Sequence, residues 1–408
     1  MAAPDRSPRT GRAGSTRRQF LLSGAVAGVG AAAAIGADQL LRPPATADPP
    51  PAAPHGQESV PFHGEHQAGI ATPAQAHATF LGLDLRDDVD REALARLMRI
   101  VSDDAARLTR GEPALADSEP ELALSPARLT VTFAFGPRLV ARASGVAPAW
   151  LRPLPEFTVD RLLPELSDGD LLVQVAADDP LTVAHAVRMI LKDTRSFTTV
   201  RWVQHGFRRA YGTERPGTTM RNLFGQVDGT VNPEPGTTDF DEVVWCTDGW
   251  LAGGTSMVLR RIAMHLDTWD ELDRSGREQS VGRYLGNGAP LTGTRERDEP
   301  DFTATTPLGF PVIGEFSHVR RARGDDPTQR IFRRGYSFDG VPAGGEVSDS
   351  GLIFVSFQAD VDRQFTPMQQ RLADLDLLNE WTTPVGSAVF AVPPGCAEGG
   401  FVGETLLT

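Results

Sequence analysis

The chain has 408 residues, of which 40% are hydrophobic and 23% are charged, and it contains 41 glycines. This composition is ordinary for a globular protein and excludes a fibrous chain, a wholly disordered chain and a small disulfide scaffold. The formal net charge of -13 argues against a nucleic-acid partner, because phosphate binding needs a dense basic surface. Cys246 and Cys396 are too few for an iron–sulfur cluster or a thiolate zinc site, and they are as compatible with a disulfide as with two free buried thiols.

The N-terminus has the pattern of an export signal. Arg17 and Arg18 form a twin-arginine signature, and an uncharged run of small and apolar residues follows over 21–37. This run is rich in Ala and Gly and is short for a membrane span, which makes a membrane anchor the less favoured interpretation. A small-x-small site at 45–47 predicts where the signal is cleaved. We therefore expect residues 1–47 to direct export by the twin-arginine translocase, to the cell envelope or the extracellular space.

A proline-rich stretch follows the export signal. Six prolines between residues 43 and 54 keep the chain extended there, and we assign residues 48–60 to a linker. The remainder divides into two halves, 61–215 and 216–408. The predicted elements occur in the same order, βαββαβ, in both halves.

Strands and helices are predicted from hydrophobic periodicity and from helix-capping residues. In the first half we expect strands at 80–85, 129–135, 171–176 and 199–203, and helices at 94–101, after Asp87 and Asp88, and at 180–191, after Asp179. In the second half we expect strands at 256–264, 331–338, 352–358 and 387–392, and helices from Asp267 and over 366–381. Two such split βαβ units would pack as antiparallel sheets with helices on their outer faces, which is an α+β fold.

Two long stretches, 213–248 and 280–316, have little predicted structure. Irregular stretches of this length are uncommon unless they carry function. The first contains Asp228 between Gly225 and Gly229. Glycines let a backbone approach a flat ligand closely, and a carboxylate between them is held in place. The same G-x-x-D-G pattern also occurs in ordinary turns, so by itself it predicts little.

A second segment, 317–338, combines a histidine with several arginines. His318 begins an H-V-R sequence, and a polar loop then leads to a strand-like run that contains Arg333 and Arg334. Neighbouring side chains in a strand point to opposite faces, so only one of these arginines can point into a given site. A lone histidine is more often a core or surface residue with its hydrogen bonds satisfied than a ligand. His318 is a candidate ligand only because of the motif residues around it.

Taken together, these segments resemble the dye-decolorising peroxidase family, in its twin-arginine-exported, deferrochelatase-like branch. The G-x-x-D-G motif, H-V-R at 318–320 and R-R-G-Y at 333–336 occur in the family's order, and further family motifs are similar to 66–73, 169–180 and 351–358. The resemblance spans essentially the whole mature chain. It implies two ferredoxin-like βαββαβ halves of the dimeric α+β barrel type and one b-type haem per chain.

The resemblance also implies roles for individual residues. His318 would be the proximal iron ligand, and its other ring nitrogen would donate to an acceptor that the sequence does not identify. Five residues would contact the porphyrin or its distal face: Gly229, Thr230, Val231, Arg333 and Phe357. The loop 320–329 is shorter than the family's pattern, which leaves the propionate contacts open.

Asp228 and Arg333 have the chemistry that peroxide cleavage needs. A base has to move a proton from one peroxide oxygen to the other, and a cation has to stabilise charge on the leaving oxygen. Asp228 can be the base, and an adjacent guanidinium favours its ionised form. Arg333 is chosen as the cation by its position in the motif, with Arg334 as the alternative.

The expected reaction is the haem-dependent reduction of hydrogen peroxide, coupled to oxidation of dyes, phenols or other aromatic reductants. Four aromatic residues are candidates for passing oxidising equivalents to bulky reductants, although each is more readily explained as a core residue: Trp245, Trp250, Tyr336 and Trp381. The main alternative is a haem-handling protein of deferrochelatase type in iron acquisition. A binding module without a cofactor is the third interpretation, and a homo-oligomer is compatible with each.

Overall fold

The computed structural model describes residues 55–342 and 348–408. The predicted signal peptide, 1–47, and residues 48–54 of the predicted linker lie outside the described residues. Within the described ranges, no helix is both long enough and apolar enough to cross a membrane.

The N-terminal half follows the predicted order of elements, with shifts at their ends and with one short helix, Pro137–Arg142, that was not predicted. It contains β1 (His77–Leu85), α2 (Arg91–Leu108), β2 (Thr130–Phe135), α3 (Pro137–Arg142), β3 (Leu171–Ala177), α4 (Pro180–Thr194) and β4 (Thr198–Phe207). Helix α4 begins as predicted, with Asp179 as its cap and Pro180 in its first turn. The cap of helix α2 is Asp90, so the predicted caps Asp87 and Asp88 were wrong.

The C-terminal half contains four short helices that were not predicted, and two of its predicted elements differ from the structure. It contains α5 (Thr238–Val244), β5 (Thr255–Met264), α6 (Leu266–Asp270), α7 (Arg274–Val281), α8 (His318–Ala322), β6 (Phe332–Arg333), β7 (Tyr336–Gly340), β8 (Asp349–Gln358), α9 (Thr366–Leu375), β9 (Thr382–Val392) and α10 (Glu404–Leu407). The predicted strand 331–338 is interrupted between Arg333 and Tyr336. The predicted helix 366–381 ends at Leu375 and is followed by a separate 3-10 turn, Leu377–Glu380.

The nine strands of the described chain form one sheet in the order β5-β9-β2-β3-β1-β4-β7-β8-β6. Strand β5 also pairs with β8, so the sheet closes into a barrel. The two halves meet at single antiparallel pairs, Phe135 with Ala391 and Phe207 with Ser337. The predicted α+β fold is therefore confirmed, with the sheets of the two halves joined into one barrel.

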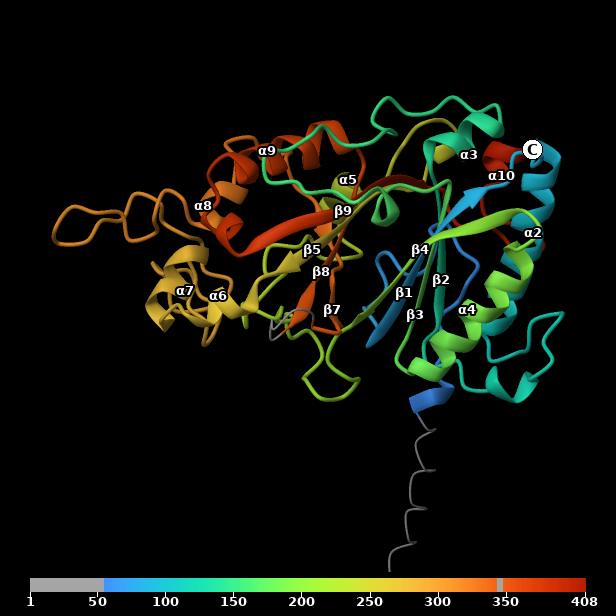
Figure 1. Cartoon of the computed structure of the whole chain (residues 1–408), viewed down its shortest axis with the longest axis horizontal. Coiled ribbons are helices and arrows are strands. Elements are labelled where there is room, and N and C mark those ends of the chain that lie inside the picture. The colour runs from blue at the N-terminus through green and yellow to red at the C-terminus, as the bar shows by residue number, and fades with distance from the viewer. Residues whose placement is uncertain (1–54, 343–347) are drawn as a thin grey trace, which may run out of the picture. The chain divides into compact units, whose positions relative to one another are not determined.

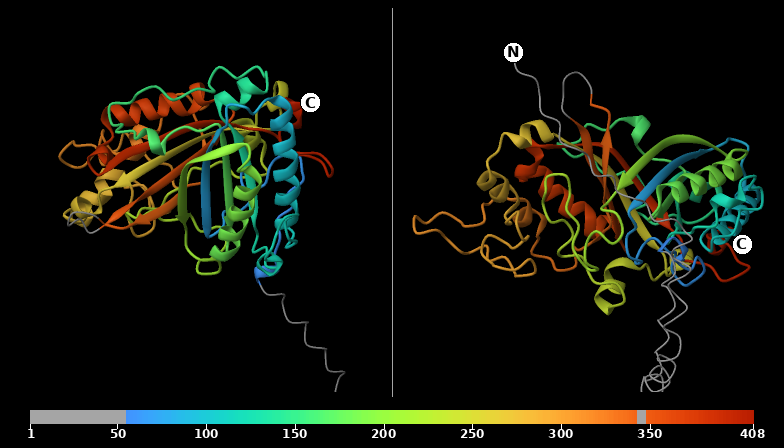
Figure 2. Two further views of the ribbon diagram at one scale, coloured as in Figure 1. Left: turned by 45° about the vertical axis from the view of Figure 1, so that its right-hand side comes forward. Right: turned by 90° about the horizontal axis from the view of Figure 1, so that it is seen from below.

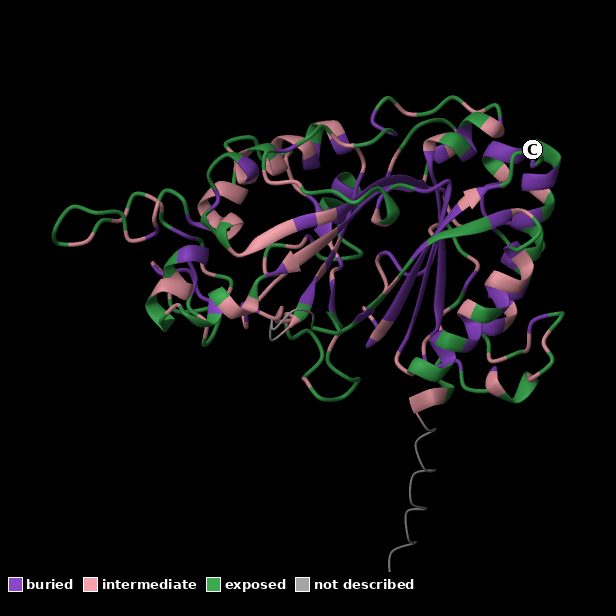
Figure 3. Cartoon of the chain, viewed as in Figure 1, coloured by how far each residue is buried: buried purple, intermediate pink, exposed green. Residues whose placement is uncertain are grey.

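The core has two main layers. Inside the barrel, strands of both halves contribute large buried side chains, among them Phe80, Tyr336, Phe357 and Phe390. Helices α2 and α4 cover the outer face of the N-terminal strands, and α9 lies beside the C-terminal strands (Figures 1 and 2). Strands β1, β2 and β3 are almost continuously buried, whereas β4 is largely exposed (Figure 3).

Candidate active site

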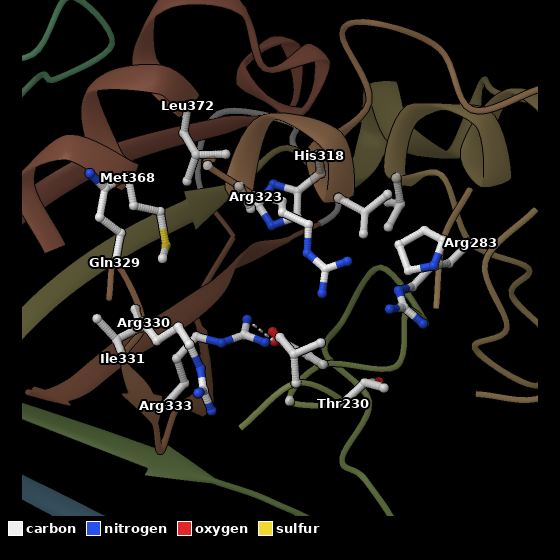
Figure 4. Close-up of a pocket in the computed structure, with 18 of the residues that line it drawn as sticks. Thr230, Arg283, His318, Arg323, Gln329, Arg330, Ile331, Arg333, Met368 and Leu372 are labelled. Atoms are coloured by element: carbon white, nitrogen blue, oxygen red, sulfur yellow. Dashed lines mark hydrogen bonds and ion pairs between the residues drawn. The ribbon is translucent and has the colours of Figure 1, made fainter. Parts of the chain in front are cut away.

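A cavity of about 780 Å³ opens in the C-terminal half, between the loop 222–231, helices α7 to α9 and strands β6 and β8 (Figure 4). Its apolar lining residues include Val281, Ile331, Phe354, Phe365, Met368, Leu372 and Leu378. Its charged lining residues include Asp228, Arg283, His318, Arg323, Arg330 and Arg333. An apolar cavity of this size with a few charged groups is typical of a site that encloses a cofactor or small ligand. Both long irregular stretches of the sequence contribute to its lining, as predicted.

His318 is the first residue of the short helix α8 and lines the cavity. Its Nδ1 lies 2.6 Å from Oδ2 of Asp376. Burial opposes the imidazolium form, but the Asp376 carboxylate outweighs burial and raises the pKa of His318. Because Nδ1 is engaged by the carboxylate, Nε2 is the ring nitrogen available to a metal ion or ligand in the cavity.

Asp376 is the acceptor that the sequence did not identify. It follows the last residue of α9 in an extended conformation, with φ -75° and ψ 124°. Its Oδ1 accepts a hydrogen bond from the main-chain N of Leu378 at 3.0 Å, so that it caps the next turn while Oδ2 holds His318. An Asp followed by a short turn is a typical cap signal, and this signal was hidden by the prediction of one continuous helix.

Asp228 is presented to the cavity by a tightly folded loop. Its main-chain N donates to the oxygen of Met220 at 2.8 Å, and Asn222 Nδ2 lies 3.4 Å from Oδ2 of Asp228. Gly225 and Gly229 have φ values of 77° and 126°, which side chains rarely tolerate. The glycines of the motif are therefore needed for the shape of the loop, as their spacing around Asp228 suggested.

Arg333 reaches Asp228 from strand β6. Its Nη1 lies 2.6 Å from Oδ1 of Asp228, and the two side chains are 25% and 19% exposed. Arg334 points the opposite way, as predicted for neighbours in a strand. It is 2% exposed and donates to main-chain oxygens of residues 70–73 and to Gln75. The structure thus places Arg333 at the cavity and Arg334 in the packing between the halves.

The remaining predicted contact residues divide into two groups. Gly229, Thr230 and Val231 line the cavity, and Thr230 Oγ1 donates to Glu296 Oε1 at 3.0 Å. Phe357 does not line it: this side chain is fully buried inside the barrel, so the expectation that it contacts the cofactor is corrected. Phe354 lines the cavity instead. Phe354 and Phe357 are an odd number of residues apart in β8, so their side chains lie on opposite faces of the strand.

Comparison with known proteins agrees with this geometry. The model of "Dyp-type peroxidase, N-terminal" matches residues 67–208, and that of "Dyp-type peroxidase, C-terminal" matches residues 219–397. The chain belongs to the Dyp-type peroxidase family. It is 37% identical to the dye-decolorizing peroxidase of Thermobifida fusca (strain YX) over 98% of this chain and 99% of that protein.

Two further relatives cover most of the chain. The deferrochelatase of Escherichia coli (strain K12) is 33% identical over 96% of this chain and 97% of that protein. The crystal structure of a DyP-type peroxidase from Cellulomonas bogoriensis superposes with a TM-score of 0.84 at 55% identity, over 87% of this chain and 99% of that chain. The protein is accordingly a peroxidase, an oxidoreductase that acts on peroxide.

The cavity of this Dyp-type peroxidase has further arginines that the sequence had not singled out. Arg283 is buried and donates to two main-chain oxygens at 2.7 and 2.8 Å. Burial lowers the pKa of Arg283, although Glu296 opposes this shift. Arg323 pairs with Glu299, whereas Arg320 donates to two main-chain oxygens at 3.2 Å. Arg283 and Arg323 both line the cavity, and an acidic group of a ligand would have to share them with these protein partners.

The four aromatic candidates for electron transfer are absent from the lining of the peroxidase cavity. Tyr336 lies inside the barrel, and Trp381 packs edge-on against Trp269 with ring centroids 5.3 Å apart. Trp245 stacks on His66 at 3.7 Å. Their packing accounts for their positions, and a role in electron transfer stays a prediction.

Proposed function

We propose that this peroxidase holds one b-type haem in the cavity, with Nε2 of His318 as the iron ligand. The observation that carries the proposal is the placement of His318 and Arg333 on opposite sides of one cavity (Figure 4). Asp376 fixes the imidazole at 2.6 Å, and Asp228 fixes the guanidinium at 2.6 Å. A metal-binding histidine commonly has such a carboxylate on its second ring nitrogen, because this sets the ring orientation and makes the ligand more basic.

The cavity suits an amphipathic planar group with two acidic side chains. Its volume is about 780 Å³, and aromatic and aliphatic side chains from β8 and α9 line it. Arg283 and Arg323 supply cations for the propionates. Haem would supply the redox chemistry, because its iron exchanges electrons with peroxide and with the reductant.

Asp228 and Arg333 would handle the peroxide. The carboxylate of Asp228 can accept the proton of one peroxide oxygen and return it to the other as the O–O bond breaks. The guanidinium of Arg333 orients that carboxylate through their 2.6 Å contact and can stabilise the charge that develops on the leaving oxygen. The reductants would be dyes, phenols and other aromatic molecules, and the relationship to a dye-decolorizing peroxidase supports this proposal.

The test of haem binding is the absorption spectrum of the purified protein and of His318→Ala. We expect a Soret band in the wild type that is lost or strongly shifted in the variant. His265→Ala is a matched control, because His265 is also hydrogen-bonded, to Thr383 at 2.9 Å, but does not line the cavity. An unchanged spectrum of His318→Ala would show that another residue ligates the iron.

A deferrochelatase-like role is the second candidate, favoured by the 33% identity to the Escherichia coli protein. Such a protein would release iron from haem in iron acquisition, with peroxidation as a secondary activity. Steady-state peroxide turnover, measured beside iron release from bound haem, separates the two. Iron release without steady turnover of an aromatic reductant would favour the deferrochelatase role.

We also propose that residues 1–47 direct export by the twin-arginine translocase, so that the enzyme acts in the cell envelope or outside the cell. The sequence supports this with Arg17, Arg18 and the uncharged run after them. Export of a folded protein suits an enzyme that has to acquire a cofactor before it leaves the cytoplasm.

A further inference from the structure

We infer that Asn232 is a positioning residue, which holds the main chain of Arg333 so that its guanidinium meets Asp228. The inference rests on the proposed role of the Asp228–Arg333 pair and adds to it a residue that acts on the arginine backbone. It starts from the shortness of strand β6, which has only two residues, Phe332 and Arg333.

The main chain of Arg333 faces away from β8, the one strand that pairs with β6 in the described part of the chain. The main-chain N of the next residue, Arg334, donates to the oxygen of Val355 in β8 at 2.8 Å. Successive residues of a strand direct their N–H and C=O groups to alternate edges, so the N–H and C=O of Arg333 point to the other edge. In an ordinary sheet a further strand would pair with them.

The side chain of Asn232 takes the place of that strand. Its Oδ1 accepts from the main-chain N of Arg333 at 3.1 Å, and its Nδ2 donates to the main-chain O of Arg333 at 2.7 Å. A carboxamide carries the same donor and acceptor as a peptide group, and Asn232 uses both on a single residue. Because these main-chain groups are partly buried, leaving them unpaired would be costly.

The loop that carries Asn232 also carries Asp228. The main-chain N of Asn232 donates to the oxygen of Gly229 at 3.0 Å, which closes a turn directly after Asp228. Gly229 has φ 126° in this turn, a conformation that few other residues adopt. One end of the turn therefore contacts the side chain of Arg333, and the other end contacts its main chain.

This arrangement predicts what each substitution at position 232 does. Asn232→Ala removes both bonds and leaves the backbone of Arg333 free to move relative to Asp228. Asn232→Asp keeps the size of the side chain and the acceptor, but it loses the donor and sets a carboxylate oxygen against the main-chain O of Arg333. Both variants should weaken the alignment of Arg333 with Asp228. If Asn232→Ala fails to fold, Asn232→Asp still tests the inference.

The test is a double-mutant cycle on the haem-loaded enzyme, read as the rate at which hydrogen peroxide changes the Soret band. Small displacements of a catalytic group can cost about 10- to 100-fold in rate, and we expect a loss of this order in Asn232→Ala. If Asn232 acts only through Arg333, adding Asn232→Ala to the Arg333→Ala variant should lower the rate by a further factor of less than about two. Equal losses in both backgrounds would overturn the inference.

A matched control is Asn287→Ala. The carboxamide of Asn287 also bridges main-chain groups, donating to Thr294 O at 2.9 Å and accepting from Ala289 N at 3.0 Å, but it is exposed and does not line the cavity. This control should retain the wild-type rate.

A crystal structure of Asn232→Ala, or of Asn232→Asp, gives a readout independent of activity. We expect the Arg333 main chain to shift and the 2.6 Å contact with Asp228 to lengthen. An unchanged Arg333 in that structure would also overturn the inference. If instead Arg333→Ala itself reacts with peroxide at the wild-type rate, the proposed role of the pair fails, while the crystal structure still decides whether Asn232 holds Arg333.

Discussion

The Nδ1 atom of His318 lies 2.6 Å from Oδ2 of Asp376, a residue 58 positions later in the chain. The carboxylate is buried, with 4% of its side chain exposed. It also caps the turn after α9, so that the position of the imidazole depends on where this helix ends. The relationship connects the folding of the C-terminal half to the proposed iron ligand.

Removing this carboxylate should weaken haem binding without abolishing it. Partners of metal-binding histidines typically contribute about 10- to 100-fold in metal affinity or activity, and we expect a loss of this order in Asp376→Asn. The variant should also shift the Soret band, because the imidazole becomes a weaker donor. Haem titration followed by absorbance measures both effects.

Asp374→Asn is the control for the Asp376 variant, because Asp374 is an exposed residue of the same helix that accepts a bond from Gln370. It should bind haem like the wild type. Equal haem affinity in Asp376→Asn and the wild type would show that the contact with His318 does not support the ligand.

Asp193 should make the stability of the fold depend on pH. Burial, and then the nearby charge of Asp104, raise the pKa of Asp193 to about 7. Aspartate in an unfolded chain ionises near ~3.9, so the folded state binds this proton more tightly than the unfolded state. Below about pH 4 the group is protonated in both states, and between about pH 4 and 7 its contribution to the free energy of unfolding falls as the pH rises.

Asp193→Asn should remove this loss of stability between about pH 4 and pH 7. The Tm of the variant, relative to that of the wild type, should rise between about pH 4 and pH 7 and stay constant above this range. Asp88→Asn, at an exposed position before α2, is the control and should follow the wild type. Parallel Tm profiles of wild type and Asp193→Asn would argue against a tightly held proton on Asp193.

The proposed export route is tested by replacing Arg17 and Arg18 with Lys. We expect the unprocessed precursor to accumulate in the cytoplasm, because the translocase recognises the arginine pair. Replacing Arg9 and Arg12 with Lys conserves charge outside the signature and should leave export intact. Fractionation and immunoblotting measure both variants, and undiminished secretion of the Arg17/Arg18 variant would rule out this route.

Local patterns predicted most of the fold, whereas the resemblance to the family assigned most residues of the site. The apolar residues of β2 and the cap of α4 are local signals, and the structure confirms the strand and the cap. Strand β2 is buried on both faces, although the alternation of its residues had predicted a half-buried strand. The glycines around Asp228 are a local signal as well, because the backbone shape of the loop requires them, but this signal identified the loop only together with the resemblance to the family. These features depend on near neighbours in the chain.

The features that were missed depend on tertiary structure. Asp376 meets His318 only because α9 ends one residue before it, and Phe357 was placed at the cavity because its strand face was not known. The strand 331–338 is interrupted where Arg334 turns into the packing between the halves and binds the chain at 70–75. No local pattern reveals such a partner more than 250 residues away.

The central claim is that Asp228 and Arg333 act together on peroxide. The most direct measurement is the stopped-flow rate of the Soret change with hydrogen peroxide, across pH, for wild type, Asp228→Ala and Arg333→Ala. Both variants should bind haem normally, and each should react with hydrogen peroxide at least about a hundredfold more slowly than the wild type. Asp103→Ala, which removes an exposed carboxylate from Arg107 outside the cavity, is the matched control and should react like the wild type.

The pH dependence sharpens this measurement. With a carboxylate as the base, the wild type should keep its rate below neutral pH, where a histidine base would already be protonated. A wild-type rate that persists in acid, together with slow reactions of both variants, is the result that the account predicts. Wild-type rates in both variants, or a slow Arg334→Ala beside a fast Arg333→Ala, would contradict it.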